Sequence, residues 1–437
     1  MIEKQTMRFA VLGLGTVGTG VMKLLRENWD IIHMKTGLNL ELAKVLVRDA
    51  SKPRPGMEDL PLTTDINDIL KDPTIKIVVE LMGGVEPARS YMIEALKWGK
   101  TVVTANKDVV SAHGKELYAA GDIGDAELYF EASVGGGIPV IRPMKESLAA
   151  NRMQKVMGIV NGTTNYILTQ MTQLGRPYEE ALREAQELGY AEPDPTADVQ
   201  GFDAARKLAI LSSIAFMSRV TPDKVYTEGI TRITPVDIAY GKRFGWVVKL
   251  LGIGKEVDGA VEARVHPAFI PAEHPLAAVS GSLNAIFAVG DPIGETMFYG
   301  RGAGAGPTAS AVVSDLIAAA LSKRTPGRRA GDACTCLFHK QVLPIEETTS
   351  RYYLRLRCPD KIGGLAEIAE VFGEEQVSIA QVLQGSGGPD HVDKTGEAEL
   401  VMVTHSVKHA NMVAVVRRLQ GMPDTVYAVE NVIRVEA

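Results

Sequence analysis

Apolar runs alternate with helix-like stretches through the first third of the chain. The run RFAVLGLG is followed by a helical pattern that places Val17, Val21 and Leu25 on one face. Later strand-like runs read LAKVLV, IKIVVEL, TVVTA and AELYFEA, and helical stretches such as EPARSYMIEALKWG and SAHGKELYAAG separate them. Because strand and helix alternate from the first residues, the pattern predicts a parallel, doubly wound α/β sheet, which we place at residues 1–140.

The rest of the chain changes pattern twice. Residues 141–325 mix long helical patterns with apolar strands such as WVVKLLGIG and VEARVHPAFI, which predicts an α+β domain. This domain ends in a glycine-rich turn and an apolar helix near 307–322. Residues 326–349 show no clear period and are expected to form a linker. In residues 350–437 the elements follow the order βαββαβ, which predicts a ferredoxin-like module.

Composition narrows the class of protein. A chain of 437 residues is expected to form two or three domains. Its formal net charge of −6 argues against a nucleic-acid partner or an anionic membrane surface. No apolar run approaches the roughly 20 residues needed to span a bilayer. Three cysteines suit a reducing cytoplasm, and we expect Cys334 and Cys336 to be buried thiols.

A glycine-rich turn follows the first predicted strand. Gly13, Gly15 and Gly18 match G-x-G-x-x-G at the first strand–helix junction, the position of a dinucleotide-binding turn in a Rossmann-type domain. These glycines permit a tight turn, a close approach of the backbone to a pyrophosphate, and close packing of helix on strand. The expected cofactor contacts are Gly13, Leu14, Gly15, Thr16, Val17 and Gly18.

The tip of the second predicted strand bears on the choice of cofactor. An acidic residue there suits the ribose hydroxyls of NAD, whereas an arginine suits the 2′-phosphate of NADP. The sequence VLVRD places Arg48 at this tip and Asp49 beside it. We favour NADP through Arg48, with NAD as the alternative.

A third polar group follows a buried strand. TVVTANKDVV places Thr104, Asn106 and Lys107 just beyond the carboxyl end of that strand, where open α/β sheets bind ligands. A solvated surface lysine is the alternative. We expect Thr104 and Lys107 to contact the cofactor.

The stretch EPDPTADVQGFDAARK concentrates carboxylates around a lysine. Its prolines exclude helix at Glu192, and the sequence then looks helical from Asp198 onward. Asp203 and Lys207 are four residues apart and so share one helix face. A surface ion pair is the simple alternative. The apolar continuation KLAILSSIAF and the excess of carboxylates instead favour a site that binds a substrate with an ammonium group.

These motifs resemble those of homoserine dehydrogenases of the long bacterial type, which carry a C-terminal ACT domain. The likeness covers nearly the whole chain and is carried by EPDPTAD, GFDAARKLAIL, TANK, EASVGGGIPVI and NGTTNYIL. It implies reversible reduction of aspartate β-semialdehyde to homoserine with NAD(P)H, on the route to threonine and methionine. It also implies that residues 141–325 bind substrate, catalyse the reaction and dimerise.

The resemblance assigns roles by position. Lys207 matches the proton-donating lysine, Asp203 its acidic partner, and Glu192 the residue that holds the substrate. Lys107 matches a second lysine that reaches cofactor and substrate. An ammonium at Lys207 suits the chemistry, because it stabilises a developing alkoxide and then transfers a proton. Asp198 is expected to assist Glu192 in pairing with the substrate's α-ammonium group.

Three further assignments keep their alternatives. EASVGGGI resembles a monovalent cation site, and a plain glycine turn is the alternative; the expected sodium ligands are Glu131, Val134, Gly136 and Ile138. Thr163 either contacts substrate or only caps a helix. Gly306 either lies against the cofactor or forms a hinge.

The module at residues 350–437 resembles an ACT domain through CPDKIGGLAEIAEVF. The resemblance implies threonine as a feedback inhibitor and a homodimer or homotetramer, and a purely dimerising module is the alternative. The sequence leaves two alternatives to homoserine dehydrogenase activity. A different amino-acid dehydrogenase would lack the lysine-and-carboxylate helix, and a non-catalytic amino-acid sensor would need neither Lys107 nor Lys207.

Overall fold

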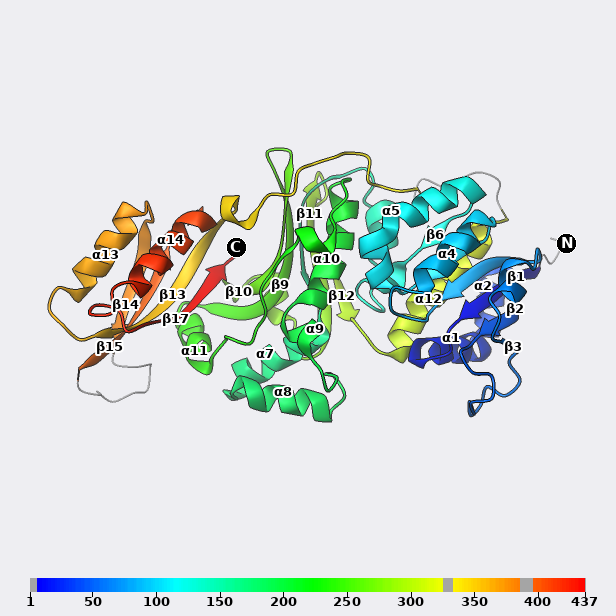
Figure 1. Ribbon diagram of the computed structural model, residues 1–437, viewed down its shortest axis with the longest axis horizontal. Helices are drawn as coiled ribbons and strands as arrows, with labels where there is room; N and C mark the ends of the chain where they lie inside the picture. Colours follow the sequence, from blue (N-terminus) through cyan, green and yellow to red (C-terminus); the bar gives the residue numbers. More distant parts are fainter. Residues whose placement is uncertain (1–5, 325–332, 386–395, 437) are drawn as a thin grey trace. The chain divides into compact units, whose positions relative to one another are not determined.

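The computed structural model describes residues 6–324, 333–385 and 396–436 (Figure 1). The predicted linker at 326–349 therefore lies partly outside the described residues. The chain divides into two compact units, each built from three segments. The first unit comprises Met1–Val156, Ala209–Pro222 and Asn284–His339, and the second comprises Met157–Leu208, Asp223–Leu283 and Lys340–Ala437.

The first unit contains a parallel six-stranded sheet. Its strands are β1 (Thr6–Leu12), β2 (Asn39–Leu46), β3 (Leu62–Thr63), β4 (Ile75–Glu80), β5 (Thr101–Thr104) and β6 (Leu128–Tyr129). Their order in the sheet is β3-β2-β1-β4-β5-β6. This is the order of a dinucleotide-binding sheet. The chain adds strands on one side of β1 as far as β3, and then continues with β4 on the other side of β1. The predicted Rossmann-type nucleotide domain is confirmed. The run AELYFEA forms only the short β6, because a 3₁₀ turn begins at Glu131.

Helices cover this sheet. They are α1 (Thr16–Glu27), α2 (Trp29–Thr36), α3 (Asn67–Leu70), α4 (Ala88–Lys97), α5 (Lys107–Gly124), α6 (Ile141–Lys145) and α12 (Ala305–Ser322). The unit also contains the 3₁₀ turn η1 (Glu131–Ser133) and strands β11 (Leu283–Asp291) and β12 (Gly294–Arg301), which are neighbours in a second sheet.

The helix α12 belongs to the core of the N-terminal sheet. Its residues Val312, Leu316 and Ala319 are buried in one apolar cluster with Val21 of α1 and Val11 of β1. Among the described residues it is the helix whose length and composition would allow it to cross a membrane. Its burial against α1 explains that apolar composition as core packing.

In the second unit, strands and helices mix. Its helices are α7 (Gly162–Leu174), α8 (Tyr178–Glu187), α9 (Thr196–Val199), α10 (Phe202–Ala215), α11 (Pro235–Arg243), α13 (Gly364–Glu374) and α14 (His409–Gln420). Its strands are β7 (Arg152–Ile159), β8 (Tyr226–Thr227), β9 (Trp246–Val257), β10 (Ala260–Pro271), β13 (Thr349–Pro359), β14 (Ile379–Gly385), β15 (Glu397–Thr404), β16 (Val407–Lys408) and β17 (Ala428–Val435). Short 3₁₀ turns add η2 (Pro222–Lys224), η3 (Pro275–Ala278) and η5 (Ile345–Glu347). The boundaries between segments of the two units fall within β7, α10 and η2, at the start of β11, and between His339 and Lys340.

The C-terminal module has the predicted ferredoxin-like order. Its strands run β17-β13-β15-β14 across the sheet, and α13 and α14 pack on one face of them (Figure 1). The module is not separate from the strands before it, because β17 continues in parallel onto β10 through Ala268–Arg434 and Phe269–Val435. The predicted α+β domain and ACT fold are confirmed.

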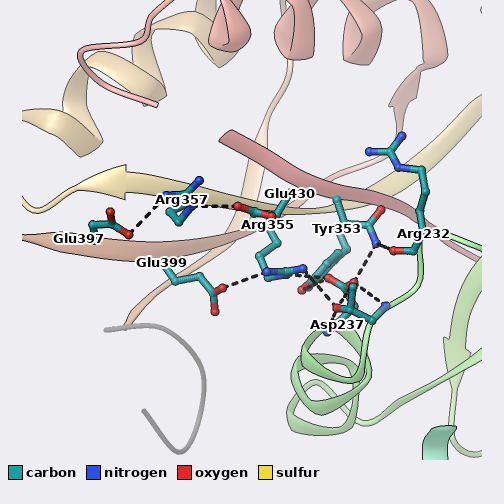
Figure 2. Close-up of polar contacts among 10 residues, drawn as sticks. Arg232, Asp237, Tyr353, Arg355, Arg357, Glu397, Glu399 and Glu430 are labelled. Atoms are coloured by element: carbon teal, nitrogen blue, oxygen red, sulfur yellow. Dashed lines mark hydrogen bonds and ion pairs between the residues drawn. The ribbon is translucent and has the colours of Figure 1, made fainter. Parts of the chain in front are cut away.

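A buried ion pair also links the C-terminal module to the helix α11. Asp237 of α11 accepts hydrogen bonds from Arg355 Nε (2.8 Å) and the Tyr353 hydroxyl (3.2 Å), as Figure 2 shows. It also accepts from the Asn431 amide at 2.8 Å. Arg355 also pairs with Glu399 at 3.1 Å. The Asp237 side chain is fully buried, so its charge is stable only with these partners in place.

The cysteine prediction is wrong in part. Cys334 and Cys336 are half-buried rather than buried. They lie in an irregular segment that is attached through the Phe338 N–H, which donates to the Met217 carbonyl at 2.8 Å. Without strand or helix periodicity, the sequence could not show which side of this segment faces the core.

Removing the buried carboxylate should destabilise the second unit. We expect Asp237→Ala to lower the free energy of unfolding by about 3–5 kcal/mol, because Arg355 would lose one of its two carboxylate partners and the buried Tyr353 and Asn431 donors would lose their acceptor. The control is Glu397→Ala, which removes the exposed Arg357–Glu397 pair (Figure 2) and should cost less than about 1 kcal/mol. Urea unfolding followed by circular dichroism measures both. Equal losses in the two variants would contradict a special role for Asp237.

Candidate functional site

The glycine turn between β1 and α1 has the geometry that a bound dinucleotide requires. Gly13 has a φ of +96°, and a Cβ there would lie 2.8 Å from the Leu81 carbonyl oxygen. A Cβ at Gly18 would lie 2.4 Å from the Gly13 carbonyl oxygen, so only glycine lets helix and strand approach this closely. A Cβ at Gly15 would meet none of the described atoms within 4 Å, so that side of the turn is open.

The helix that follows can receive a phosphate. α1 begins at Thr16, and no side chain of the described residues caps its first N–H groups. Those N–H groups and the positive end of the helix dipole favour an anion. Gly15 and Thr16 are exposed, whereas Leu14 and Val17 are half-buried against the core. The turn therefore fits a dinucleotide cofactor with its pyrophosphate at Gly15 and Thr16.

The tip of β2 carries the two candidate specificity residues. Arg48 is exposed. Asp49 accepts hydrogen bonds from the backbone N–H and the hydroxyl of Ser51 at 2.8 and 2.6 Å. The Ser51 hydroxyl is the main cause that lowers the pKa of the Asp49 carboxyl. Asp49 is thus engaged in a local turn, and the Arg48 guanidinium projects from the same loop.

Polar groups gather at the carboxyl ends of β4 and β5. The Thr104 hydroxyl donates to the carboxylate of Glu80 at 2.6 Å, and Glu80 is fully buried. The Asn106 side chain caps α5 and donates to the Gly84 carbonyl at 2.7 Å. Lys107 is the first residue of α5 and is half-buried. Sequence reasoning found Thr104 and Lys107 but missed Glu80, which the run IKIVVEL shows only as one acidic residue at the end of a strand.

The lysine predicted to act as an acid lies in a buried cluster in the second unit. Lys207 Nζ donates to Asp203 Oδ2 at 2.7 Å and to the Val160 carbonyl at 2.8 Å. The Lys207 and Asp203 side chains are only 13% and 9% exposed, so this is not a surface ion pair. The spacing of four residues on α10 places them on one face, as the sequence predicts.

An asparagine joins this cluster to a second carboxylate. Asn161 donates from its amide nitrogen to Asp203 Oδ2 at 2.9 Å and to Asp198 Oδ1 at 2.7 Å. Its amide oxygen accepts from the Thr164 N–H at 2.9 Å, which caps α7. Sequence reasoning did not find this bridge. The bridge was not visible because it joins positions 37 and 42 residues away.

The predicted continuous helix around these residues is wrong. The chain breaks between α9 and α10 at Gly201, which has a φ of +84°. A Cβ there would lie 3.1 Å from both Thr227 Cγ2 and Val265 Cγ1, so the adjoining strands hold this turn close. The break places Asp198 and Asp203 on different helices and allows both to meet Asn161.

Two other predicted substrate residues lie apart from these contacts. Glu192 is exposed on the segment between α8 and α9, and its backbone carbonyl accepts from the Gln186 amide at 3.2 Å. Thr163 is buried on α7, and its hydroxyl donates to the Tyr190 carbonyl at 2.6 Å. The structure therefore brings Asp198, Asp203 and Lys207 together around Asn161. These hydrogen bonds of Glu192 and Thr163, in contrast, run to other residues.

The predicted cation segment is buried in the first unit. The Glu131 carboxylate accepts from the N–H groups of Val140, Ile141 and Arg142 at 2.6–2.9 Å. These donors engage both carboxylate oxygens. The expected sodium ligands Val134 and Ile138 are also buried, and backbone carbonyls of that kind suit a sodium ion.

The rest of that segment is tightly packed. Gly136 has a φ of +56°, and a Cβ there would lie 2.2 Å from the Gly302 carbonyl oxygen. A buried carboxyl, Asp315 of α12, accepts from the Glu131 N–H at 2.7 Å. Burial raises the pKa of Asp315 to about 7. A cavity of about 310 Å³ adjoins this region and is lined partly by Arg142, Glu146 and Ser310.

A Rossmann-type sheet in one chain with a buried lysine–carboxylate cluster is typical of a nicotinamide-nucleotide-dependent dehydrogenase. Family models agree: "Homoserine dehydrogenase, NAD binding domain" matches residues 13–131, "Homoserine dehydrogenase" matches 139–317, and "ACT domain" matches 352–424. The chain belongs to the homoserine dehydrogenase family, whose members are oxidoreductases acting on a CH–OH group. Gly306 lies within this match, exposed in the first turn of α12.

Full-length relatives support this assignment. The chain is 45% identical over 432 residues to a homoserine dehydrogenase of Corynebacterium glutamicum, covering 98% of this chain and 95% of the relative. It is 42% identical to one of Bacillus subtilis, covering 99% of both. A crystal structure of a homoserine dehydrogenase from Thiobacillus denitrificans superposes with a TM-score of 0.92 at 39% identity over 99% of both chains.

Proposed function

We propose that this chain reduces aspartate β-semialdehyde reversibly to homoserine with NAD(P)H, and that Lys207 donates the proton. The buried Lys207–Asp203 pair is the observation that carries the proposal. An i,i+4 pair that served only helix stability would sit on the surface, where desolvation costs little. Here two side chains of opposite charge are withdrawn from water, and Asn161 fixes the acidic partner.

The geometry of Lys207 suits this role. Its ammonium has three N–H donors, and within the described part of the chain two of them are held by Asp203 and Val160. The third is left for an incoming aldehyde oxygen. When bound, the reduced nicotinamide supplies a hydride to the aldehyde carbon. The oxygen then carries negative charge, which Lys207 stabilises and neutralises by giving up a proton. A proton taken up from solution then restores the Lys207 ammonium.

Acidic groups would hold the amino-acid end of the substrate. We assign Asp198, on the far side of Asn161 from Lys207, and the exposed Glu192 to the substrate's α-ammonium group. Thr163 would act through the loop that it anchors at Tyr190. Lys107, Thr104 and Gly306 are assigned to the cofactor, and Lys107 also to the substrate. Sodium held by the segment from Glu131 to Ile138 remains part of the proposal.

NADP is the proposed preferred cofactor. Arg48 is exposed at the strand tip while Asp49 is engaged with Ser51, so the guanidinium is the better placed of the two to meet a 2′-phosphate. We expect Arg48→Ala to raise the KM for NADPH about tenfold or more with little change for NADH, since one charged hydrogen bond would be lost. Steady-state kinetics with each cofactor measures this. A wild-type enzyme that prefers NADH would remove Arg48 from the role.

The ACT fold supports threonine as an effector of the enzyme. We place the enzyme in the cytoplasm and in the biosynthesis of threonine and methionine. The effect of a ligand bound to this module would be transmitted to the rest of the second unit through the pairing of β17 with β10 and through the Asp237–Arg355 ion pair. Two strands offer edges for a homodimer or homotetramer. β14 is the last strand of its sheet path, and β12 exposes Met297 and Tyr299.

Replacing the proposed proton donor should lower kcat without weakening cofactor binding. We expect Lys207→Ala to lower kcat by ~10²–10⁴ with cofactor affinity intact, as for loss of a general acid. Homoserine-dependent NADP reduction and cofactor titration measure the two quantities. The matched control is Lys23→Ala, which breaks the exposed i,i+4 pair Lys23–Glu27 and should leave kcat unchanged. Near wild-type turnover of Lys207→Ala would exclude this mechanism.

Threonine should inhibit the full-length enzyme. We expect millimolar threonine to lower activity in a saturable way and to raise the melting temperature, because a ligand that binds only the folded state stabilises it. Alanine at the same concentration is the control. If threonine changed neither activity nor melting temperature, the ACT module would have another ligand or serve assembly alone.

A further inference from the structure

Glu80 is a buried carboxylate at the end of β4 to which sequence and family comparison assign no role here. It is 0% exposed. Its oxygens accept from the Thr104 hydroxyl at 2.6 Å and from the Met82 N–H at 2.7 Å. The Gly83 N–H and the Asn106 side chain also stabilise its ionised form. Burial has the largest effect and raises the pKa of the Glu80 carboxyl, against the effect of these hydrogen bonds. All of these donors are neutral groups, so in its ionised form Glu80 brings an uncompensated negative charge to this edge of the sheet.

The donors belong to loops that follow different strands. Met82 and Gly83 lie in the loop after β4, and a Cβ on Gly13 of the dinucleotide turn would lie 3.0 Å from Met82 Cα. Thr104 and Asn106 lie in the loop after β5. One carboxylate therefore holds two loops directly and supports the loop after β1 through backbone contact.

The loop after β5 is fixed in detail. The Thr104 hydroxyl, while donating to Glu80, also accepts from the Asn106 N–H at 3.0 Å. Asn106 caps α5 and ties it to the Gly84 carbonyl. Lys107 follows at once as the first residue of α5. The position of Lys107 thus depends on a chain of hydrogen bonds that begins at Glu80.

The place of Glu80 in the sheet indicates which part of the cofactor it serves. The strand order reverses between β1 and β4, and a dinucleotide lies across the crevice at this point. The glycine turn and the tip of β2 belong to the half that holds the adenosine end. The nicotinamide end is then expected at the half of the sheet built on β4, β5 and β6. Glu80 is the last residue of β4 and lies at the carboxyl ends of these strands.

A purely structural role does not account for a carboxylate here. A fully buried anion costs several kcal/mol relative to a neutral side chain of the same size. The hydrogen bonds from the Thr104 hydroxyl and the Met82 N–H need only an acceptor, which a glutamine oxygen supplies in part. What glutamine lacks is the charge. The oxidised nicotinamide ring is cationic and the reduced ring is neutral, so a nearby negative charge discriminates between them.

We propose that Glu80 positions the nicotinamide-side loops, including Lys107, and that its charge favours the oxidised over the reduced cofactor. The inference rests on the proposed cofactor site and not on Lys207 as proton donor. Binding is measured without substrate, so a failure of the Lys207 mechanism would leave the test intact.

The test compares dissociation constants of NADP⁺ and NADPH by titration of the full-length protein. We expect Glu80→Gln to weaken NADP⁺ binding about tenfold more than NADPH binding, as loss of one nearby charge would do. Glu80→Asp keeps the charge and should restore most of that preference. Glu94→Gln removes an exposed carboxylate from α4 and should leave both constants unchanged.

The variant Thr104→Val tests the effect of loop position without changing the charge of Glu80. It also keeps the proposal testable if Glu80→Gln does not fold. It removes the hydroxyl that Glu80 accepts but leaves the carboxylate in place. We expect it to weaken both cofactor forms by similar factors. Equal weakening of NADP⁺ and NADPH by Glu80→Gln, or no weakening, would overturn the proposal. So would a Thr104→Val variant that shifts the preference as strongly as loss of the charge.

Discussion

The lysine–carboxylate cluster of the second unit depends on a single buried carboxylate. Asp203 accepts from both Lys207 and Asn161 on the same oxygen, so the ammonium and the amide are held in a fixed relation to each other. Asn161 in turn caps α7 and reaches Asp198 on α9. Three helices are therefore joined through Asp203 and Asn161. The charges in this cluster are stable in a poorly hydrated place only because each has a partner.

Buried acidic residues recur at the points where the chain's elements must be held in register. Glu80 joins the loops after β4 and β5, and Asp237 joins α11 to the strands of the ACT module. Each accepts several hydrogen bonds from groups far apart in sequence. Apolar packing at these points would be less demanding of geometry, since it is not directional. These carboxylates thus specify the geometry of the loops, helices and strands that they join.

The sequence predicts the fold well, because its signals are local. Alternating strand and helix, the glycines at 13, 15 and 18, and the βαββαβ order of the last 88 residues each depend on near neighbours. The spacing of Asp203 and Lys207 is likewise local. What escaped prediction depends on distant partners. The break at Gly201 follows from strands that hold it, and the roles of Asn161 and Glu80 follow from loops brought together only in the fold.

The place of α12 in the core of the first unit has a consequence for biosynthesis. The apolar face of the N-terminal sheet and α1 receives Val312 and Leu316, which emerge from the ribosome long after that sheet has been made. At roughly 5–20 residues per second, the nascent chain waits on the order of ten seconds or more with this face uncovered. During that interval it is a natural substrate for chaperones that shield apolar surface.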